Sequence, residues 1–260
     1  MRVARTLNQS ETNKNVKESG LVTSSQTGVH PHLEKHVLRH LEQPWSQPFH
    51  LPSSDAYQRL KDEGVLYEDK AIILDSGCGT GKSTQRLAGL FPRHIVIGID
   101  QSNVRLARSG VSCGFFQSGN CILLRAELST FWRLLLKDGF SPERHYLLYP
   151  NPWPKPGHLK RRWHGHPVFP QLLCLGGEIE MRCNWEIYAL EFAQAVNLAT
   201  GADIRPTRIH PDIGISPFEQ KYLERGHALF SVTVPVTETG LDPDRPTDYS
   251  DSVSTFGGGV

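Results

Sequence analysis

The stretch AIILDSGCGTGKS at residues 71–83 decides the fold of this chain. The apolar run 71–74 is typical of a short buried strand, and the three glycines after it are typical of a tight turn that opens into a helix. A Walker phosphate loop is excluded, because the position where it needs its first glycine holds Ser76. A dinucleotide fingerprint is excluded as well, since the glycines follow G-x-G-x-G rather than G-x-G-x-x-G. The glycines then either let the backbone approach another kind of ligand or form a tight strand-to-helix turn that binds no ligand.

Strand and helix patterns continue to alternate after this turn. The predicted strands cover 71–74, 95–99, 121–124, 146–149 and 178–181, with later β-rich segments at 204–209 and 228–236. The predicted helices cover 83–90, 102–108, 130–136 and 185–198. Such an alternation predicts a doubly wound α/β domain with a mostly parallel sheet. Ligands of these sheets bind beyond the carboxyl ends of the strands.

Composition excludes several classes of protein. The 260 residues carry 28 Lys+Arg against 27 Asp+Glu, so a globally basic nucleic-acid binder is excluded and a local basic patch is not. No run of 18 apolar residues is present and the amino-terminus lacks the apolar core of a secretory signal, so we expect no membrane partner. Five cysteines without a CxxC pair favour reduced thiols and a cytoplasmic location.

Three regions are expected along the chain. Residues 1–29 are polar and are predicted to be a disordered arm. Residues 30–236 form the domain, with a helical extension at its amino-terminal side carried by pieces such as 36–41 and 56–60. Residues 237–260 are predicted to be a disordered tail.

Two acidic residues follow the second and third predicted strands. Asp100 stands about 20 residues beyond the glycines. At this position a carboxylate would accept hydrogen bonds from the ribose hydroxyls of a ligand. Its alternative role is to cap the following helix. Glu127 follows the third strand and is either a ligand contact or a favourable acid in the first turn of a helix.

The segment YPNPWPKPGHLKRRWH at residues 149–164 follows the fourth strand. Its prolines disfavour an α-helix. It lies in a stretch without acidic residues between Glu143 and Glu178, and it interleaves basic side chains with tryptophan and histidine. Cations for phosphates and planar groups for bases are what nucleic-acid binding requires, and the alternative is a solvated basic loop. His158, His164 and His166 lack cysteine partners at the spacing of a structural zinc site, so no metal is expected.

These motifs resemble a known family over about residues 70–235. The glycine turn resembles that of class I S-adenosylmethionine-dependent methyltransferases. Segment 149–162 resembles the F-x-D-P-W-x-K-x-x-H-x-K-R-R signature of tRNA (guanine-N7)-methyltransferases. Further matches are Cys183-Asn184 through Tyr188, similar to T-D-x-x-x-Y, and Ser216 through Glu219, similar to T-x-F-E. The resemblance implies a seven-stranded Rossmann-like sheet and methyl transfer from S-adenosylmethionine to guanine N7 of tRNA, at variable-loop position 46.

The same resemblance implies roles for individual residues. Asn151 would lie beside the target base as the catalytic residue. The residues expected to bind the cofactor are Asp75, Gly77, Gly79, Asp100 and Glu127. The residues expected to bind phosphates or to complete the substrate pocket are Lys155, Lys160, Arg161, Arg162, Asn184, Ser216 and Glu219. A monomer or a homodimer is expected, with no obligate protein partner. Phe218, Leu223 and Phe230 are expected in the core rather than at a stacking site.

The departures from the family pattern keep two other hypotheses open. Asn151 and Asn184 stand where the family has aspartates, and losing a charge-assisted hydrogen bond costs about 1.5–3 kcal/mol. Guanine N7 has its own lone pair, so an asparagine enzyme could still act by positioning. Asn151-Pro152-Trp153 also resembles, out of register, the motif of methyltransferases that modify exocyclic amino groups. The third hypothesis is a non-catalytic relative that binds S-adenosylmethionine or tRNA.

Overall fold

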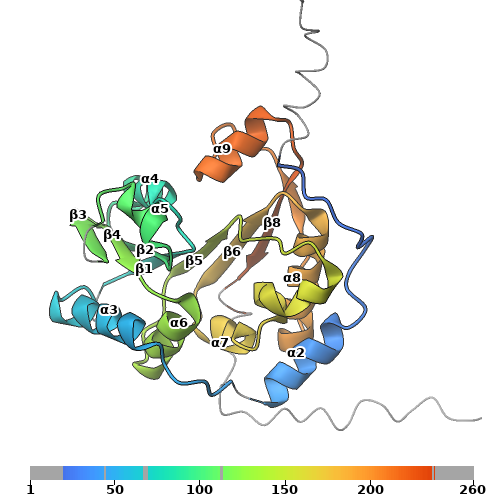
Figure 1. The fold of residues 1–260 in the computed structure, drawn as a ribbon, viewed down its shortest axis with the longest axis horizontal. Coiled ribbons are helices and arrows are strands. Elements are labelled where there is room, and N and C mark those ends of the chain that lie inside the picture. The colour runs from blue at the N-terminus through green and yellow to red at the C-terminus, as the bar shows by residue number, and fades with distance from the viewer. Residues whose placement is uncertain (1–19, 44, 67–69, 112–113, 236, 238–260) are drawn as a thin grey trace, which may run out of the picture.

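The computed structural model describes residues 20–43, 45–66, 70–111, 114–235 and 237. A single sheet runs through the molecule and helices cover both of its faces (Figure 1). Its strands are β1 (Ile72–Ser76), β2 (Ile95–Asp100), β3 (Phe115–Ser118), β4 (Cys121–Arg125), β5 (Arg144–Leu148), β6 (Glu178–Cys183), β7 (Thr207–Ile209) and β8 (Leu229–Val234).

The α-helices in the described residues are α2 (Leu33–Glu42), α3 (Leu51–Asp62), α4 (Lys82–Leu90), α5 (Asn103–Ala107), α6 (Leu128–Lys137), α7 (Phe169–Cys174), α8 (Glu186–Thr200) and α9 (Pro217–Glu224). Two short 3₁₀ turns, η1 (Pro156–Arg161) and η2 (Trp163–Gly165), lie in the proline-rich segment. The prolines there do exclude an α-helix, and the chain folds into tighter turns instead. Among the described residues, no helix is long and apolar enough to cross a bilayer.

The strand order is β3-β4-β2-β1-β5-β6-β8-β7. The five strands from β4 to β6 are parallel, whereas β3, β7 and β8 pair antiparallel to their neighbours. The predicted α/β class with a mostly parallel sheet is therefore confirmed. From β1 the chain first builds toward β4 and then resumes on the other side with β5, so the carboxyl ends of β1 and β5 border the switch point.

The expectation of seven strands is wrong by one. β3 adds an eighth strand at the edge, as a hairpin that pairs Phe115 with Leu124 and Ser118 with Cys121. Gly119, with a φ of 58°, and Asn120 form the two-residue connection. The strand has four residues and no helix follows it, so strand–helix alternation did not reveal it.

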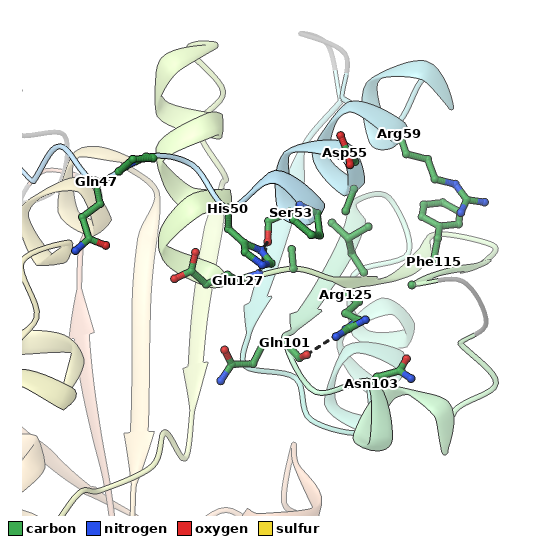
Figure 2. A pocket seen from close by; sticks show the side chains of 16 residues that line it. Gln47, His50, Ser53, Asp55, Arg59, Gln101, Asn103, Phe115, Arg125 and Glu127 are labelled. Carbon is green, nitrogen blue, oxygen red and sulfur yellow. Dashed lines mark hydrogen bonds between the residues drawn. The ribbon is translucent and has the colours of Figure 1, made fainter.

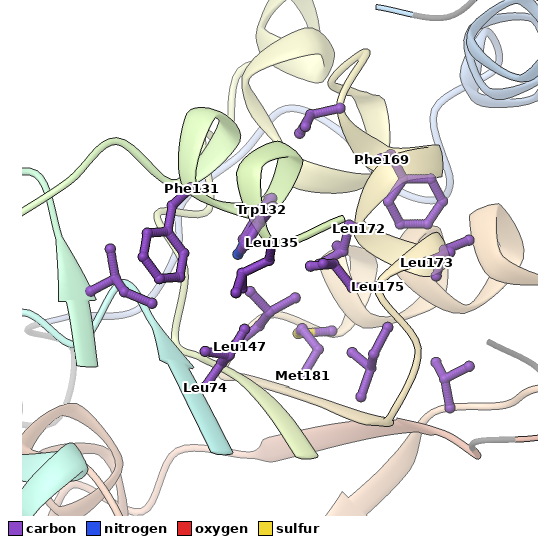
Figure 3. Packing of buried hydrophobic residues seen from close by; sticks show 14 of the residues in the cluster. Leu74, Phe131, Trp132, Leu135, Leu147, Phe169, Leu172, Leu173, Leu175 and Met181 are labelled. Carbon is purple, nitrogen blue, oxygen red and sulfur yellow. The ribbon is translucent and has the colours of Figure 1, made fainter. Parts of the chain in front are cut away.

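Each central strand contributes to two apolar clusters, because successive side chains point to opposite faces. Ile72 and Leu74 of β1 pack with α2, α3, α6, α7 and α8, while Ile73 packs with α4 and α5. Figure 3 shows the larger cluster, where Trp132 of α6 and Leu172 of α7 lie over Leu147 of β5. The two clusters fix the sheet between helical layers and leave the carboxyl ends of its strands facing one edge.

The amino-terminal arm departs from its prediction. The described residues 20–29 are not a loose tail: this extended segment runs from the neighbourhood of α9 to the start of α2 (Figure 1). The Ser24 hydroxyl donates to the Pro154 carbonyl, and the Gln26 amide donates to the Glu191 carboxylate. The polar composition of this segment predicted disorder, but its Ser24 and Gln26 side chains bond to partners more than 100 residues away in the chain. The remainder of the arm and residues 238–260 of the predicted tail lie outside the described residues.

Gly98 of β2 tests the close packing of α4 on the sheet. A Cβ at this position would lie 2.1 Å from Thr84 Oγ1 and 2.9 Å from Leu123 Cδ2. We expect Gly98→Ala to lower the free energy of unfolding by about 1–3 kcal/mol, measured by urea denaturation followed by circular dichroism. Gly89→Ala, at an exposed position of α4, is the matched control, because nothing lies within 4 Å of its Cβ position. This variant should be more stable than the wild-type protein by about 0.5–1 kcal/mol. Equal stability of the two variants would contradict the packing argument.

Candidate functional site

A cavity of about 610 Å³ opens at the carboxyl ends of β1, β2 and β5. It lies where the topology places the ligand site of a doubly wound sheet. Seven of the thirteen predicted site residues line it, namely Gly77, Gly79, Asp100, Glu127, Asn151, Arg161 and Ser216. The other six lie outside its lining, and several of them have structural partners instead.

The glycine turn forms one wall of this cavity. Gly77 and Gly79 have φ angles of 83° and 61°, a region that favours glycine. No atom lies within 4 Å of the position that a Cβ would occupy at either residue. The backbone is held from behind, because the amides of Gly77 and Cys78 donate to the Ile99 carbonyl. The turn therefore presents bare backbone to open space, which fits the close approach of a ligand.

Asp75 is not part of the lining. Its carboxylate is buried against α4, where Oδ2 accepts hydrogen bonds from Ser83 Oγ at 2.6 Å and Thr84 Oγ1 at 2.7 Å. Burial raises the pKa of Asp75 to about 6, against the opposing effect of those two bonds. The expected cofactor contact is thus replaced by a supporting role, since this side chain anchors the first turn of α4 to β1. Alternation along β1 is the reason: Asp75 points to the α4 face and Ser76 to the α6 face.

Asp100, the last residue of β2, lines the cavity next to the glycine turn. Its Oδ2 accepts from the Gly79 amide at 3.0 Å, and Oδ1 accepts from the Ser102 amide at 2.7 Å and lies 3.1 Å from Arg105 Nη2. A carboxylate offers about four acceptor sites, so about one remains, on Oδ2. The capping interpretation is wrong, because Ser102 is the N-cap residue of α5. Asp100 fixes the loop before α5, which Ser102 caps, and still borders the cavity.

Glu127 is the N-cap residue of α6 and also lines the cavity. Its carboxylate accepts from Ser129 Oγ at 2.7 Å and from Thr130 Oγ1 at 2.6 Å, while its backbone amide donates to Ser53 Oγ of α3. The amino-terminal extension therefore packs directly behind this corner of the site.

The loop after β5 is strained where it meets the cavity. Tyr149 and Trp153 have φ angles of 53° and 44°, and they are the two non-glycine residues with positive φ in the described chain. Strain of this kind concentrates at functional sites. Between them, the side-chain oxygen of exposed Asn151 accepts from the Trp153 amide at 3.2 Å. That bond turns the chain and holds Asn151 at the edge of the cavity.

Three of the four predicted phosphate ligands are exposed: Lys155, Lys160 and Arg161. We call them the basic loop. The Arg161 guanidinium lies 4.8 Å from the centre of the Trp153 ring, within the range of a cation–π contact, and both residues line the cavity. Lys155 and Lys160 lie beside the cavity rather than in its lining.

Arg162 is a correction to the sequence analysis. Its side chain is completely buried, so it cannot reach a phosphate in this structure. The guanidinium pairs with the buried carboxylate of Glu191 on α8 and donates to the Trp153 carbonyl. Glu191 also accepts from His164 Nε2 at 2.9 Å and from the His30 amide at 3.0 Å. Burial alone would raise the pKa of Glu191, but its bonds and charges with His164 and Arg162 lower it to about 2.

Glu219 is a second correction. Its buried carboxylate accepts from Tyr149 Oη and Arg182 Nη1, each at 3.0 Å, and from the Ile215 amide. It therefore holds strained Tyr149 in place rather than contacting a ligand.

Ser216 caps α9 by accepting from the Glu219 amide at 3.1 Å, and lines the cavity as well. Asn184 lies outside the lining, where its amide donates to the Gly20 carbonyl at 3.2 Å.

Among the lining residues that the sequence analysis did not assign are Arg105, Arg108, Lys221 and Phe218. Phe218 was expected in the core, but its surface is 49% exposed at the mouth of the cavity. Arg105 lies in the last turn of α5 and Arg108 is its C-cap residue, while Lys221 lies in the last turn of α9. The available signal was that α5 follows the end of β2 and that α9 begins at Ser216, a predicted site residue. With Arg161 these three cations place positive charge on more than one side of the opening.

A second, larger hollow of about 1090 Å³ adjoins the first. Figure 2 shows it between α3 and the loop after β2, with Glu127 and Gln101 at the border of the two cavities. The Arg59 guanidinium lies 4.2 Å from the centre of the Phe115 ring at its far end. The hollow continues the crevice along the carboxyl end of β4.

Comparison with known proteins shows the family of this chain. The model of a family described as "Putative methyltransferase" matches residues 69–232. The chain belongs to this methyltransferase family. Its relatives include a tRNA (guanine-N(7)-)-methyltransferase of Photobacterium profundum, 28% identical over 67% of this chain and 73% of the relative. One of the same name from Nitrosomonas europaea is 29% identical over 60% of this chain and 72% of the relative. A solved 16S rRNA methyltransferase, KamB, aligns at 16% identity with a TM-score of 0.47, over 73% of this chain and 95% of that one.

Neighbouring cations in this methyltransferase should differ sharply in their effect on stability. Arg162→Met leaves the Glu191 carboxylate buried without its strongest partner, so we expect the free energy of unfolding to fall by about 3–5 kcal/mol. Lys160→Met removes an exposed cation from the same loop and should change it by less than about 0.5 kcal/mol. Chemical denaturation at pH 7 measures both. An Arg162→Met protein as stable as the Lys160→Met protein would show that the buried pair does not hold the loop.

Proposed function

We propose that this methyltransferase transfers a methyl group from S-adenosylmethionine to N7 of guanine in tRNA. One observation carries the proposal: a glycine-turn cavity and an exposed basic-aromatic loop meet at Asn151, after β5. The first feature suits a nucleoside cofactor and the second suits an RNA backbone. The names of the relatives support the choice of tRNA and of guanine N7.

The residues of the cavity fit this cofactor. Bare backbone at Gly77 and Gly79 leaves room for it, and the remaining acceptor site of Asp100 suits a ribose hydroxyl. Glu127 and Leu128 border the side of the cavity that adenine would occupy. When bound, S-adenosylmethionine supplies an electrophilic methyl carbon, which bonds to the N7 lone pair while the S–C electron pair stays on sulfur.

The protein's own part in this reaction is orientation. Guanine N7 already carries a lone pair, so no side chain has to remove a proton before the transfer. Asn151 can hold the base through its amide, and the fixed turn at Trp153 keeps that amide at the cavity edge. Tyr149, Trp153 and Trp163 line the opening with aromatic surface, which excludes water around the reacting atoms.

The basic loop is proposed to bind tRNA phosphates. Its three cations are exposed, carry no ion pair with the described residues, and lie next to the cavity rather than deep inside it. The four described cysteines, Cys78, Cys121, Cys174 and Cys183, are free thiols, which fits the reducing cytoplasm where tRNA is modified. We propose action as a monomer or a homodimer.

The product of the reaction tests the proposed function. The protein is incubated with unmodified tRNA and labelled S-adenosylmethionine, and the nucleosides are separated by mass spectrometry. We expect 7-methylguanosine. N-methylated adenosine or guanosine would instead support an exocyclic-amino methyltransferase, and intact binding without label would support a non-catalytic relative.

Asn151→Asp should raise kcat/KM for tRNA by about tenfold. The Asp carboxylate can accept hydrogen bonds from the guanine N1–H and N2 amino group. A hydrogen bond to a charged acceptor is stronger than one to a neutral acceptor by roughly 1.4 kcal/mol. Asn184→Asp is the matched control, because Asn184 bonds to Gly20 outside the cavity lining, and it should bring no gain. A loss of activity in the Asn151→Asp enzyme would contradict this placement of the base.

The basic loop should govern the salt dependence of tRNA affinity. Lys155→Ala, Lys160→Ala and Arg161→Ala should each lower the slope of log Kd against log salt concentration by about 0.7–0.9, the value for one phosphate contact. Fluorescence anisotropy with labelled tRNA measures the slope. Arg93→Ala is the control, since exposed Arg93 precedes β2 at the opposite end of the sheet. Slopes unchanged in all three loop variants would rule out the loop as the phosphate site.

A further inference from the structure

Ser76 ends β1 with a polar side chain in an apolar setting. It shares a face with Leu74, toward α6, and it is only 4% exposed while still lining the glycine-turn cavity. Its Oγ lies 2.8 Å from His145 Nε2 on β5 and 3.0 Å from Trp132 Nε1 on α6. Three polar groups therefore meet inside the larger apolar cluster, directly beneath the site.

The hydrogen positions in this triad follow from its partners. Trp132 can only donate, so one lone pair of Ser76 Oγ is taken. His145 is fully buried, which lowers its pKa to about 3, so the ring is neutral at pH 7 and carries one N–H. Its Nδ1 has no hydrogen-bond partner among the described residues. A proton on Nδ1 would be a buried donor without an acceptor, which proteins avoid more strictly than an unused acceptor. The proton therefore belongs on Nε2, and His145 donates to Ser76.

This arrangement leaves one hydrogen uncommitted. Ser76 Oγ accepts twice, from Trp132 and from His145, so its own O–H is used by neither. Of the three residues, Ser76 alone is among those that line the cavity, so the cavity is where its free O–H would find an acceptor. Two rigid aromatic donors thus fix a hydroxyl donor at the floor of the site.

Sheet order indicates what lies above that hydroxyl. β1 lies between β2, whose end carries Asp100, and β5, whose following loop carries Asn151. A cofactor with its ribose at Asp100 and its methyl group facing the base at Asn151 must pass its amino-acid portion over the end of β1. The one anionic acceptor in that portion is the carboxylate.

We propose that the Ser76 hydroxyl, oriented by His145 and Trp132, donates a hydrogen bond to the carboxylate of the methionine portion of S-adenosylmethionine. The inference rests on the proposed function and names a contact within it. Ser76 is then a cofactor-binding residue, and His145 and Trp132 are positioning residues that touch no ligand.

Two ligands isolate this contact. S-adenosylhomocysteine carries the amino-acid carboxylate, whereas 5′-methylthioadenosine has the same adenosine and thioether without it. Isothermal titration calorimetry compares both ligands on the wild-type protein and on Ser76→Ala. We expect Kd for S-adenosylhomocysteine to rise about 10- to 100-fold, the range of a charge-assisted bond, and Kd for 5′-methylthioadenosine to change less than about threefold.

Ser129→Ala is the matched control. Ser129 also lines the cavity with a buried hydroxyl, but it donates to Glu127 on the side assigned to adenine. It should therefore change the affinity for both ligands by the same factor. If Ser76→Ala does not fold, Ser76→Cys takes its place with the same expectation, because a thiol of similar size is a weak donor.

An equal loss for both ligands in the Ser76 variant, or no loss for S-adenosylhomocysteine, would overturn the proposal while leaving the proposed function intact. Wild-type protein that binds neither ligand would overturn both. The proton position is tested independently by ¹⁵N NMR of the imidazole rings at pH 7. Protonation of His145 at Nε2 is expected, and protonation at Nδ1 would overturn the orientation argument.

Discussion

The loop after β5 depends on the buried ion pair between Glu191 and Arg162. A charge in the middle of α8 is tolerated because Arg162, His164, the Gln26 amide and the His30 backbone all converge on it. Arg162 in turn holds the Trp153 carbonyl, and this keeps the strained turn at Trp153 in place. The exposed cation–π pair of Trp153 and Arg161 exists in its present position because a fully buried ion pair lies directly behind it.

A second buried carboxylate has the same effect from the other side of the loop. Glu219 binds Tyr149 Oη and thereby fixes the first strained residue, as Arg162 fixes the second. Asn151 lies between these two anchors. The segment is short and rich in proline, so it cannot form regular backbone hydrogen bonds. Acidic side chains of α8 and α9 hold it instead, through the side chains of Arg162 and Tyr149. Two buried acids outside the cavity lining thus set the geometry of the loop that borders the cavity.

The strand–helix order, the parallel sheet and the convergence of Gly77, Gly79, Asp100 and Asn151 were all predictable from sequence, because the carboxyl ends of parallel strands meet at one edge. Which charged residues are exposed and which are buried could not be predicted from the sequence. Arg161 and Arg162 are adjacent and equally basic in sequence, yet the 3₁₀ turn sends one to solvent and the other into the core. The counter-charge on α8 is 29 residues away in a largely apolar helix, so no local pattern distinguishes the two arginines.

The extended segment before α2 gives the site an unusual folding order. Gln26 and Glu191 are 165 positions apart, so their contact closes a long loop. At a synthesis rate of about 5–20 residues per second, Gln26 leaves the ribosome roughly 10–30 s before its partner exists. The sheet can assemble strand by strand during that interval, whereas the loop beside the cavity can reach its final form only after α8 has been made. Contacts of such high sequence separation form late, so the loop beside the cavity is among the last parts of a newly made molecule to reach its final geometry.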